Sequence, residues 1–339
     1  MLRWFAMRML WLVVMLFGIT FVTFVVLDQA PVDRAALEVA RSAPTSTMPD
    51  AQSRDAAILR LRIRYGMVDP ATLQQAPVLD RYFAWLGNAV TGRFAGPNED
   101  HAALWHRLLE AAPVTMWLGF LSLLVAFLVG MPLGIQMGMH PGGRCDRIVS
   151  PLLFAAVGVP EFLLATLLLL AFSGAWLQWL PASGLRSNGA EQWTFVAQVA
   201  DFGMHLILPV AVMSVGPLVL ITRFLRASVA RTLSAPFAVN LRALGIEPAI
   251  VRRRLLANAC APVVTLVGGL LPMVVTGSIV VENLFALDGL GHLIYSAVMH
   301  QDQGMVMALV VVFSVGTTLA LLASDLLHRL VDPRVGLTS

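Results

Sequence analysis

Acidic residues in the apolar parts of the chain are the first candidates for chemistry. Glu161 lies in the middle of a long apolar stretch and directly follows Pro160. A charged side chain at the centre of a membrane helix costs roughly 2.5 kcal/mol or more, so such a residue is a functional candidate. Two interpretations stay open. Glu161 faces a passage and contacts a cationic group of a solute or a gating partner, or it pairs with a polar group of its own helix bundle or carries a proton.

A second acidic group stands at the outer end of a later apolar stretch. Glu282 and Asp288 flank that end, and Gly289 and Gly291 follow. Because glycine has no side chain, it adopts backbone conformations that other residues avoid, and these two glycines would permit a tight turn. A turn with a purely structural role is one interpretation of this group.

Most catalytic and cofactor chemistry is excluded by the residue types. The sequence has no lysine, so it has neither a nucleotide-binding P-loop of the usual form nor a Schiff-base lysine. The histidines show no metal-binding spacing, and Cys145 and Cys260 lie far apart without the pattern of a disulfide framework or a zinc site. We therefore predict no catalytic, cofactor or metal site.

The elements that hold the acidic candidates are predicted to be membrane helices. Hydrophobic residues make up 58% of the chain and charged residues only 13%, whereas a soluble domain carries about 25% charged residues. About 20 apolar residues cross a bilayer as a helix. Six stretches qualify and predict an all-α integral membrane protein with six spans: about Met9–Leu27, Val114–Met139, Ile148–Phe172, Met204–Thr222, Pro262–Val281 and Gly304–Leu327.

The distribution of arginine predicts the orientation of the chain in the membrane. Arginines concentrate at both termini, between spans two and three and between spans four and five, all on one side if there are six spans. Because short positively charged loops stay in the cytoplasm, both termini are predicted to be cytoplasmic. The segment between spans one and two balances its arginines with acidic residues and exceeds the roughly 60-residue limit of this rule. The predicted division is a first membrane helix at 1–28, an extracytoplasmic segment at 29–111 and a five-helix core at 112–335.

The cytoplasmic segment at residues 234–260 predicts two short helices around a glycine. Phe237, Leu241 and Leu244 are spaced to share one helix face. Gly245 is placed to end the first helix in a left-handed conformation, and Pro248 then starts the second. The arginines alone would fit a loop that meets anionic lipid headgroups, but an apolar face needs something to bury against. We therefore favour a protein partner beneath the membrane.

Short motifs in a fixed order carry a resemblance to a known family. They are Leu180-Pro181-Ala182-Ser183-Gly184, Arg242-Ala243-Leu244-Gly245, Asn258-Ala259-Cys260-Ala261-Pro262-Val263-Val264-Thr265, Glu282-Asn283-Leu284-Phe285, Gly289-Leu290-Gly291, Asp325-Leu326-Leu327 and Asp332-Pro333-Arg334. In this order they resemble the motifs of ABC-importer permeases for dipeptides, oligopeptides and nickel, best over about residues 107–335. The long external segment resembles that of the first, B-type, of the two permeases in such systems.

The resemblance implies a type I importer fold and roles for individual residues. The segment at 234–260 resembles the cytoplasmic coupling loop that docks on the ATPase. The residues implied in ATPase coupling are Phe237, Leu241, Arg242, Ala243, Gly245, Arg252, Arg253 and Asn258. The residues expected along the translocation path or at its gate are Glu161, Glu282, Gly289 and Gly291.

The implied function is that of a permease subunit in the bacterial inner membrane, without enzyme activity of its own. Its expected partners are a second permease, two ATP-binding subunits, a periplasmic solute-binding protein and the lipid bilayer, with no nucleic acid. An ion-coupled secondary transporter is an alternative, but it would show inverted repeats and several intramembrane charges. A membrane scaffold or sensor is a further alternative. The solute stays open among peptides, nickel complexes, glutathione and other small molecules.

Overall fold

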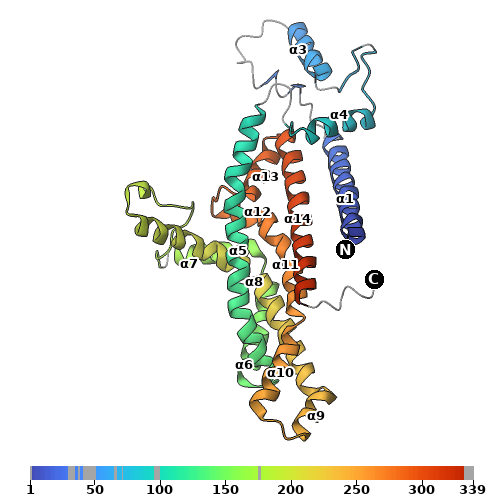
Figure 1. The fold of residues 1–339 in the computed structure, drawn as a ribbon. Helices are drawn as coiled ribbons and strands as arrows, with labels where there is room; N and C mark the ends of the chain where they lie inside the picture. Colours follow the sequence, from blue (N-terminus) through green and yellow to red (C-terminus); the bar gives the residue numbers. More distant parts are fainter. Residues whose placement is uncertain are drawn as a thin grey trace. The chain divides into compact units, whose positions relative to one another are not determined.

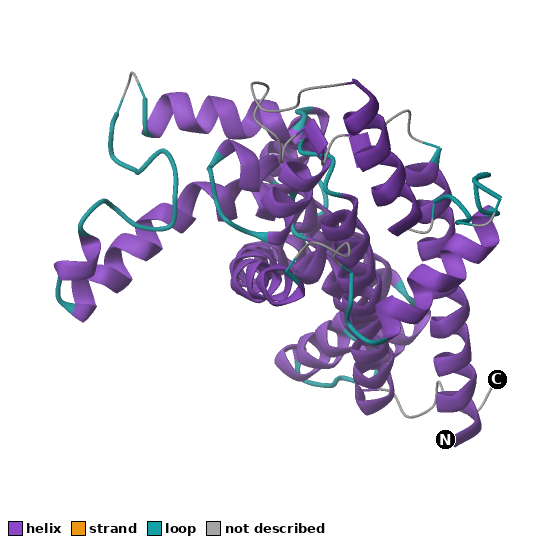
Figure 2. Ribbon diagram, turned by 90° about the horizontal axis from the view of Figure 1, so that it is seen from above, coloured by secondary structure: helices purple, strands orange, loops and turns teal. Residues whose placement is uncertain are grey.

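The computed structural model describes residues 2–29, 35–36, 39–40, 51–64, 67–70, 72–94, 100–174 and 177–331. In these residues the chain consists of helices and loops, and Figure 2 shows no strand among them. The helices in Figure 1 are α1 (Leu2–Asp28), α3 (Ala51–Arg64), α4 (Val78–Val90), α5 (His101–Met139), α6 (Arg144–Gly158), α7 (Glu161–Phe172), the short 3-10 helix η1 (Ala190–Gln192), α8 (Phe195–Ser234), α9 (Pro236–Ala243), α10 (Pro248–Cys260), α11 (Val263–Thr276), α12 (Ile279–Leu284), α13 (Leu290–Met299) and α14 (Gln303–Val331). The all-α prediction is confirmed, and the motif Asp332-Pro333-Arg334 lies outside the described residues.

Five of the described helical stretches are long and apolar enough to cross a membrane. A sixth span results if α6 and α7, which are bent by 106° where they join, count as one. This agrees with the six predicted spans, of which the third is the bent one. Val159 is extended at the bend and precedes Pro160. Proline has no N–H to donate and disfavours the helical conformation in the residue before it, so the break follows from the sequence.

The backbone of the chain divides into two compact units. One unit is Met1–Leu108 with Ala297–Ser314, and the other is Leu109–Ser296 with Val315–Ser339. The boundaries predicted from the sequence, at residues 28 and 111, instead mark where the chain is expected to leave and re-enter the membrane. The two divisions therefore describe different properties of the chain.

In the first unit, α4 packs on α1 through a buried tyrosine. The ring of Tyr82 lies edge-on to the rings of Phe17 and Phe21. Arg81, the residue before it, forms an ion pair with Asp28 at the end of α1. These contacts fix the first helix of the unit to a helix from the segment that follows it.

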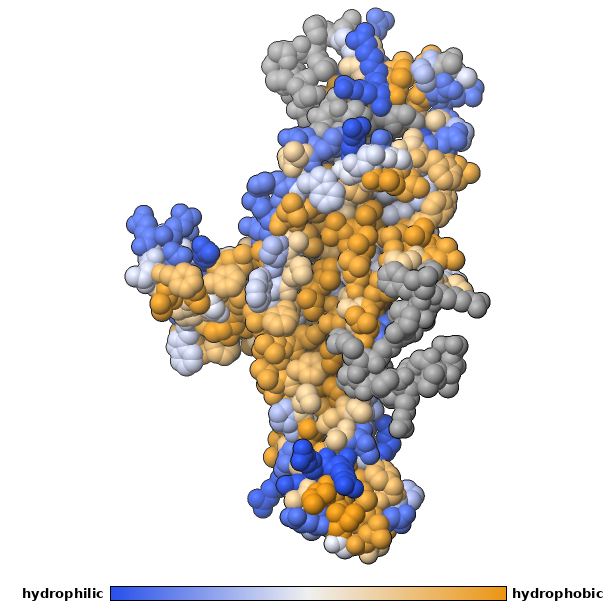
Figure 3. All heavy atoms as spheres, viewed as in Figure 1, coloured by the Kyte–Doolittle hydropathy of each residue, from blue (hydrophilic) through white to orange (hydrophobic). Residues whose placement is uncertain are grey.

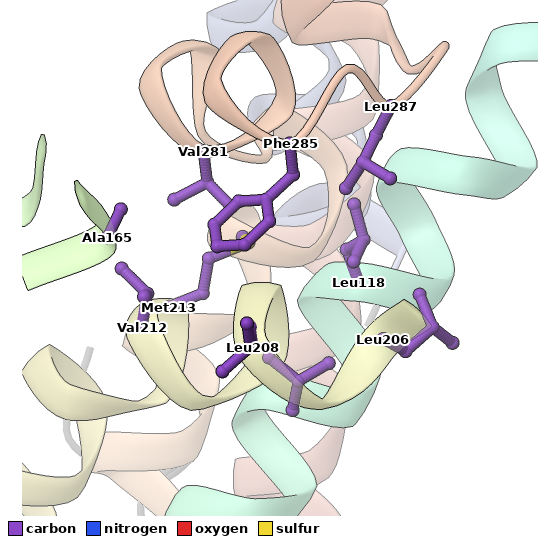
Figure 4. Packing of buried hydrophobic residues seen from close by; sticks show 10 residues of the cluster. Leu118, Ala165, Leu206, Leu208, Val212, Met213, Val281, Phe285 and Leu287 are labelled. Carbon is purple, nitrogen blue, oxygen red and sulfur yellow. The ribbon is translucent and has the colours of Figure 1, made fainter. Parts of the chain in front are cut away.

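The core of the second unit gathers around Phe285 (Figure 4). The same cluster contains buried side chains from four helices, namely Leu118 of α5, Ala165 of α7, Met213 of α8 and Val281 of α12. Each of these residues comes from a different apolar stretch of the sequence. The cluster therefore fixes the short helix α12 within the bundle.

Helices α5 and α8 approach each other closely along a line of glycines. Gly130, Gly134 and Gly138 recur every fourth residue on α5 and lie against α8. A Cβ atom on Gly134 would come within 2.7 Å of Leu225 Cβ and of the Thr222 carbonyl oxygen. Small residues at this spacing allow membrane helices to pack backbone to backbone.

Replacing Gly134 by Val is expected to destabilise the bundle by about 1–3 kcal/mol, because the new side chain has no room against α8. Gly203→Val is the matched control, since Gly203 lies in α8 with nothing within 4 Å of the position of its Cβ. Thermal unfolding of the two variants in detergent measures the difference. Equal unfolding midpoints would contradict the close packing of α5 on α8.

The surface of the second unit separates apolar from polar residues. Its visible face is largely apolar along α5, whereas hydrophilic residues, with hydrophobic ones among them, gather where α9 and α10 lie (Figure 3). An apolar belt with a polar end is the pattern that a bilayer and an aqueous compartment require of a spanning bundle.

Candidate functional site

Two short helices with a glycine between them form the candidate coupling segment at residues 234–260. Helix α9 is followed by Gly245 at φ +68°, and α10 then begins with Pro248 at its first turn. The left-handed conformation of Gly245 is the one that the sequence predicted at this position. Nothing lies within 4 Å of the position that a Gly245 Cβ would take, so this backbone is open on its outer side.

The coupling segment is anchored to the long helix α8. Ala238, Val251 and Leu255 form a small buried cluster that joins α9 to α10. The buried hydroxyl of Ser228 in α8 donates a hydrogen bond of 2.8 Å to the carbonyl oxygen of Ala259 in α10. Because hydroxyl and carbonyl are both buried and paired, α10 is held to α8 by polar as well as apolar contacts.

A pocket of about 460 Å³ lies at the root of the coupling segment. The end of α5, the end of α8 and helix α10 contribute to its lining. The lining residues are Met139, His140, Leu233, Ile246, Pro248, Val251, Arg252 and Leu255.

The predicted apolar face of α9 divides between the inside and the outside of the segment. Leu241 packs inward beside the buried cluster. Phe237 and Leu244 point outward, and Leu244 is 74% exposed. Sequence spacing did not show that Val239 and Ile250 are exposed as well. The outward face is therefore apolar without being covered by the chain itself.

The remaining predicted coupling residues lie on the surface of the same segment. Ala243, Arg252, Arg253 and Asn258 are exposed. The side chain of Arg242 lies outside the part that the structure describes. The outward face thus combines apolar side chains with arginines from α10.

An ion pair that the sequence did not reveal joins α6 to α8. The guanidinium of Arg226 donates two hydrogen bonds to the carboxylate of Asp146, the longer of them 2.8 Å. Asp146 also accepts hydrogen bonds from the Gly142 backbone N–H and the Ser150 hydroxyl. Bidentate pairs of this kind fix orientation as well as distance. Helix α6 is therefore tied to the same helix that carries the coupling segment.

Glu161 lies at the bend between α6 and α7. Its side chain is exposed, and Oε2 accepts a hydrogen bond of 3.0 Å from the hydroxyl of Ser278. Ser278 in turn caps α12, because its oxygen accepts the N–H of Val281 at 3.3 Å. The fifth span is also interrupted here, since Gly277 has φ +60°. Two interrupted spans therefore meet at Glu161.

The energetics of Glu161 indicate which surroundings suit it. A charged side chain at the centre of a membrane helix costs about 2.5–3.5 kcal/mol. A carboxylate in the first turn of a helix gains about 0.3–1 kcal/mol from the helix dipole, which is less than that cost. Ser278 supplies one of the roughly four hydrogen bonds that a carboxylate accepts. A face with water or polar groups therefore suits Glu161 better than lipid.

The carboxylate of Glu282 is fully buried and caps helix α13. Its Oε2 accepts the backbone N–H groups of Gly291 at 2.7 Å and of His292 at 3.0 Å. Its Oε1 accepts the hydroxyl of Thr115 at 3.0 Å, and that hydroxyl accepts the N–H of Leu290 at 2.7 Å. The N–H groups at a helix start bind negative charge well. Glu282 and Thr115 therefore join α12, α13 and α5.

The neighbouring glycines make room for this carboxylate. A Cβ atom on Gly291 would lie 2.9 Å from Glu282 Oε2, and one on Gly277 would lie 2.5 Å from Oε1. A Cβ atom on Gly289 would collide with the carboxylate and with the Thr115 hydroxyl. Gly289 and Gly291 are not among the glycines with positive φ. The sequence suggested that they permit a turn, whereas the structure shows that they leave space for Glu282.

The two cysteines lie in α6 and at the end of α10. Cys145 and Cys260 are not joined in a disulfide bond. Burial raises the pKa of the Cys260 thiol, because desolvation disfavours the thiolate. Among the residues that the structure describes, no group of three or more His, Cys, Asp or Glu side chains is arranged to hold a metal ion.

The apolar bundle of interrupted spans, with an exposed helix–glycine–helix segment fixed to the long helix α8, defines a multi-span membrane protein. Residues 130–337 match the family of binding-protein-dependent transport system inner membrane components. This is more than half of the chain, and the protein belongs to that family.

Curated relatives extend the likeness over the whole chain. The oligopeptide transport system permease protein AppB of Bacillus subtilis is 28% identical over 97% of each chain. A putative peptide permease of Brucella suis is 29% identical over 100% of each chain. The peptidoglycan transport system permease protein YejB of Agrobacterium fabrum is 28% identical over 76% of this chain and 72% of its own.

The predicted class is confirmed. The chain is a permease subunit of an ABC transport system, embedded in the membrane, and the family works with ATP-binding and substrate-binding partners. The permease is not itself the ATPase of such a system. Family membership decides against the secondary transporter and the scaffold.

Proposed function

We propose that this chain forms half of the membrane passage of an importer for peptides or a related small solute in the bacterial inner membrane. A second permease of the same kind supplies the other half. Two ATP-binding subunits drive the passage from the cytoplasm, and a periplasmic solute-binding protein delivers the solute. The relatives named as oligopeptide and peptide permeases, which match nearly the full length of the chain, support the choice of solute.

The observation that carries the proposal is the coupling segment. Its outward face exposes Phe237 and Leu244, while Ser228 and Ala259 fix its other side to α8. An exposed apolar patch marks a surface for a protein partner. A partner that moves this patch also moves α8 and, through Arg226 and Asp146, helix α6. ATP-driven closure of the partner subunits is thereby converted into a movement of the bundle.

The distribution of charge supports the proposed orientation. The exposed arginines Arg252, Arg253 and Arg254 lie on the coupling segment. Arginine-rich loops stay on the cytoplasmic side of the membrane. Residues 234–260 and both termini therefore face the cytoplasm, and residues 29–111 face the exterior.

Purification of the complete transporter through a tag on this chain tests the proposal. We expect a second permease and ATP-binding subunits to co-purify. In proteoliposomes that contain ATP, a mixture of short peptides should accumulate when the binding protein is added, and mass spectrometry identifies the peptides. Omission of ATP is the control. Uptake that persists without ATP, or a complex without ATP-binding subunits, would contradict the proposal.

A further inference from the structure

A pocket of about 290 Å³ lies beside the bend between α6 and α7. Helices α6, α7, α8 and α11 contribute to it, and Glu161 is its acidic residue. The lining residues are Ala156, Val157, Val159, Glu161, Leu164, Val212, Met213, Val215, Gly216, Pro217 and Met273. This volume is just below the range for small-molecule pockets, about 300–1,000 Å³, and suits a part of a solute.

The Glu161 carboxylate has capacity for a further donor. Ser278 donates to Oε2. In the described residues, no arginine or histidine forms an ion pair with Glu161, and no protein group donates to its Oε1. A charged amine is the donor that a carboxylate binds most strongly, through short charge-assisted hydrogen bonds.

The rest of the lining is apolar and adaptable. Val157 of α6, which is exposed, and Met273 of α11, which is half-buried, flank the pocket. The methionine side chain is flexible and polarisable, so Met273 can accommodate apolar groups of different shapes. A site with one carboxylate and an adaptable apolar wall suits a solute that carries a cationic amine next to a variable apolar group.

We propose that this pocket is a solute-binding subsite of the passage, in which Glu161 binds the cationic amine of the solute. For a peptide, that amine is the free amino terminus, and Val157 and Met273 contact the first side chain. The inference rests on the proposed function and adds to it a preference for solutes that carry a free cationic amine. Ser278 holds one carboxylate oxygen, so that the other is directed to the solute.

The test compares peptides with free and with acetylated amino termini in proteoliposomes of the complete transporter. Di- and tripeptides of alanine, leucine and phenylalanine in both forms are supplied together, and uptake is measured by mass spectrometry. Because the same binding protein serves every variant, a change in the ratio of free to acetylated uptake reports on the permease alone. Glu161→Gln is expected to lower this ratio about tenfold, and Glu161→Asp to restore most of it. Glu191→Gln, which changes an exposed acid outside the pocket, should leave the ratio unchanged.

Each other outcome has a definite meaning. If Glu161→Gln lowers the uptake of both peptide forms equally, the subsite is overturned. That result would show that Glu161 has only a structural role, in which case Ser278→Ala should have the same effect. An unchanged ratio in Glu161→Gln also overturns it, while ATP-dependent uptake of peptides by the unmodified transporter still supports the proposed function. No peptide uptake by the unmodified transporter contradicts the peptide substrate and the subsite together.

Discussion

Replacing Leu244 by Asp is expected to lower solute-stimulated ATP hydrolysis of the complete transporter at least tenfold without unfolding this chain. Leu244 is 74% exposed and lies next to Gly245, at the outward side of the coupling segment. Burying a leucine side chain in an interface contributes about 1.5–3 kcal/mol. Aspartate loses that contribution and brings an unpaired charge into an apolar contact. A loss of about 3 kcal/mol corresponds to roughly hundredfold weaker docking.

Stability and coupling are measured separately in this experiment. Thermal unfolding of the isolated chain should be the same for Leu244→Asp and the unmodified protein, because Leu244 does not pack in the buried cluster of the segment. ATP hydrolysis with and without the binding protein then measures coupling. Val90→Asp is the matched control, since Val90 is 80% exposed at the end of α4, outside the coupling segment. Normal stimulation in Leu244→Asp would refute docking at this face.

Two further substitutions separate docking from internal packing. Leu241→Asp places a charge beside the buried cluster and should lower both stability and stimulation. Gly245→Trp leaves the cluster intact but fills the open space outside Gly245 and strains its left-handed backbone. It should therefore abolish stimulation with a smaller loss of stability than Leu241→Asp.

Local patterns in the sequence were sufficient for the long apolar helices and for Gly245. Hydropathy located the spans, because each depends on the residues of a single stretch. Gly245 could be predicted because a glycine between an apolar helix face and Pro248 has few other uses. The inward direction of the Leu241 side chain could not be predicted. Helix spacing shows that residues share a face of α9, but it does not show which of them turn toward α10.

Contacts between distant stretches were outside the reach of sequence patterns. Asp146 and Arg226 stand 80 positions apart, and nothing near either residue marks the other as its partner. The hydroxyl of Thr115, 167 positions before Glu282, has no local signal either. Only the packing of α5 against α12 and α13 brings it to the carboxylate. For Glu282, the sequence left a structural role open, and the hydrogen bonds support that role.

Replacing Glu282 by Ala is expected to destabilise the folded bundle by at least about 3 kcal/mol. The carboxylate accepts three hydrogen bonds, from Thr115, Gly291 and His292. Hydrogen bonds to a charged group contribute about 1.5–3 kcal/mol each, and buried donors left without a partner add a desolvation cost. The missing side chain also leaves a space next to Gly289. The yield of monodisperse protein and its thermal unfolding in detergent measure the effect.

Glu282→Gln distinguishes the structural role from a role of the charge in the passage. A glutamine oxygen at the position of Oε2 still accepts the N–H groups of Gly291 and His292. Its amide nitrogen then faces the Thr115 hydroxyl, which has lone pairs to accept a hydrogen bond. Stability should therefore fall much less than in Glu282→Ala, and transport should be retained. If glutamine preserved stability but abolished transport, the charge itself would act in the passage. Glu282 is fully buried against Thr115 and the start of α13. We therefore expect the stability and the transport of each variant to follow the number of hydrogen bonds that it keeps.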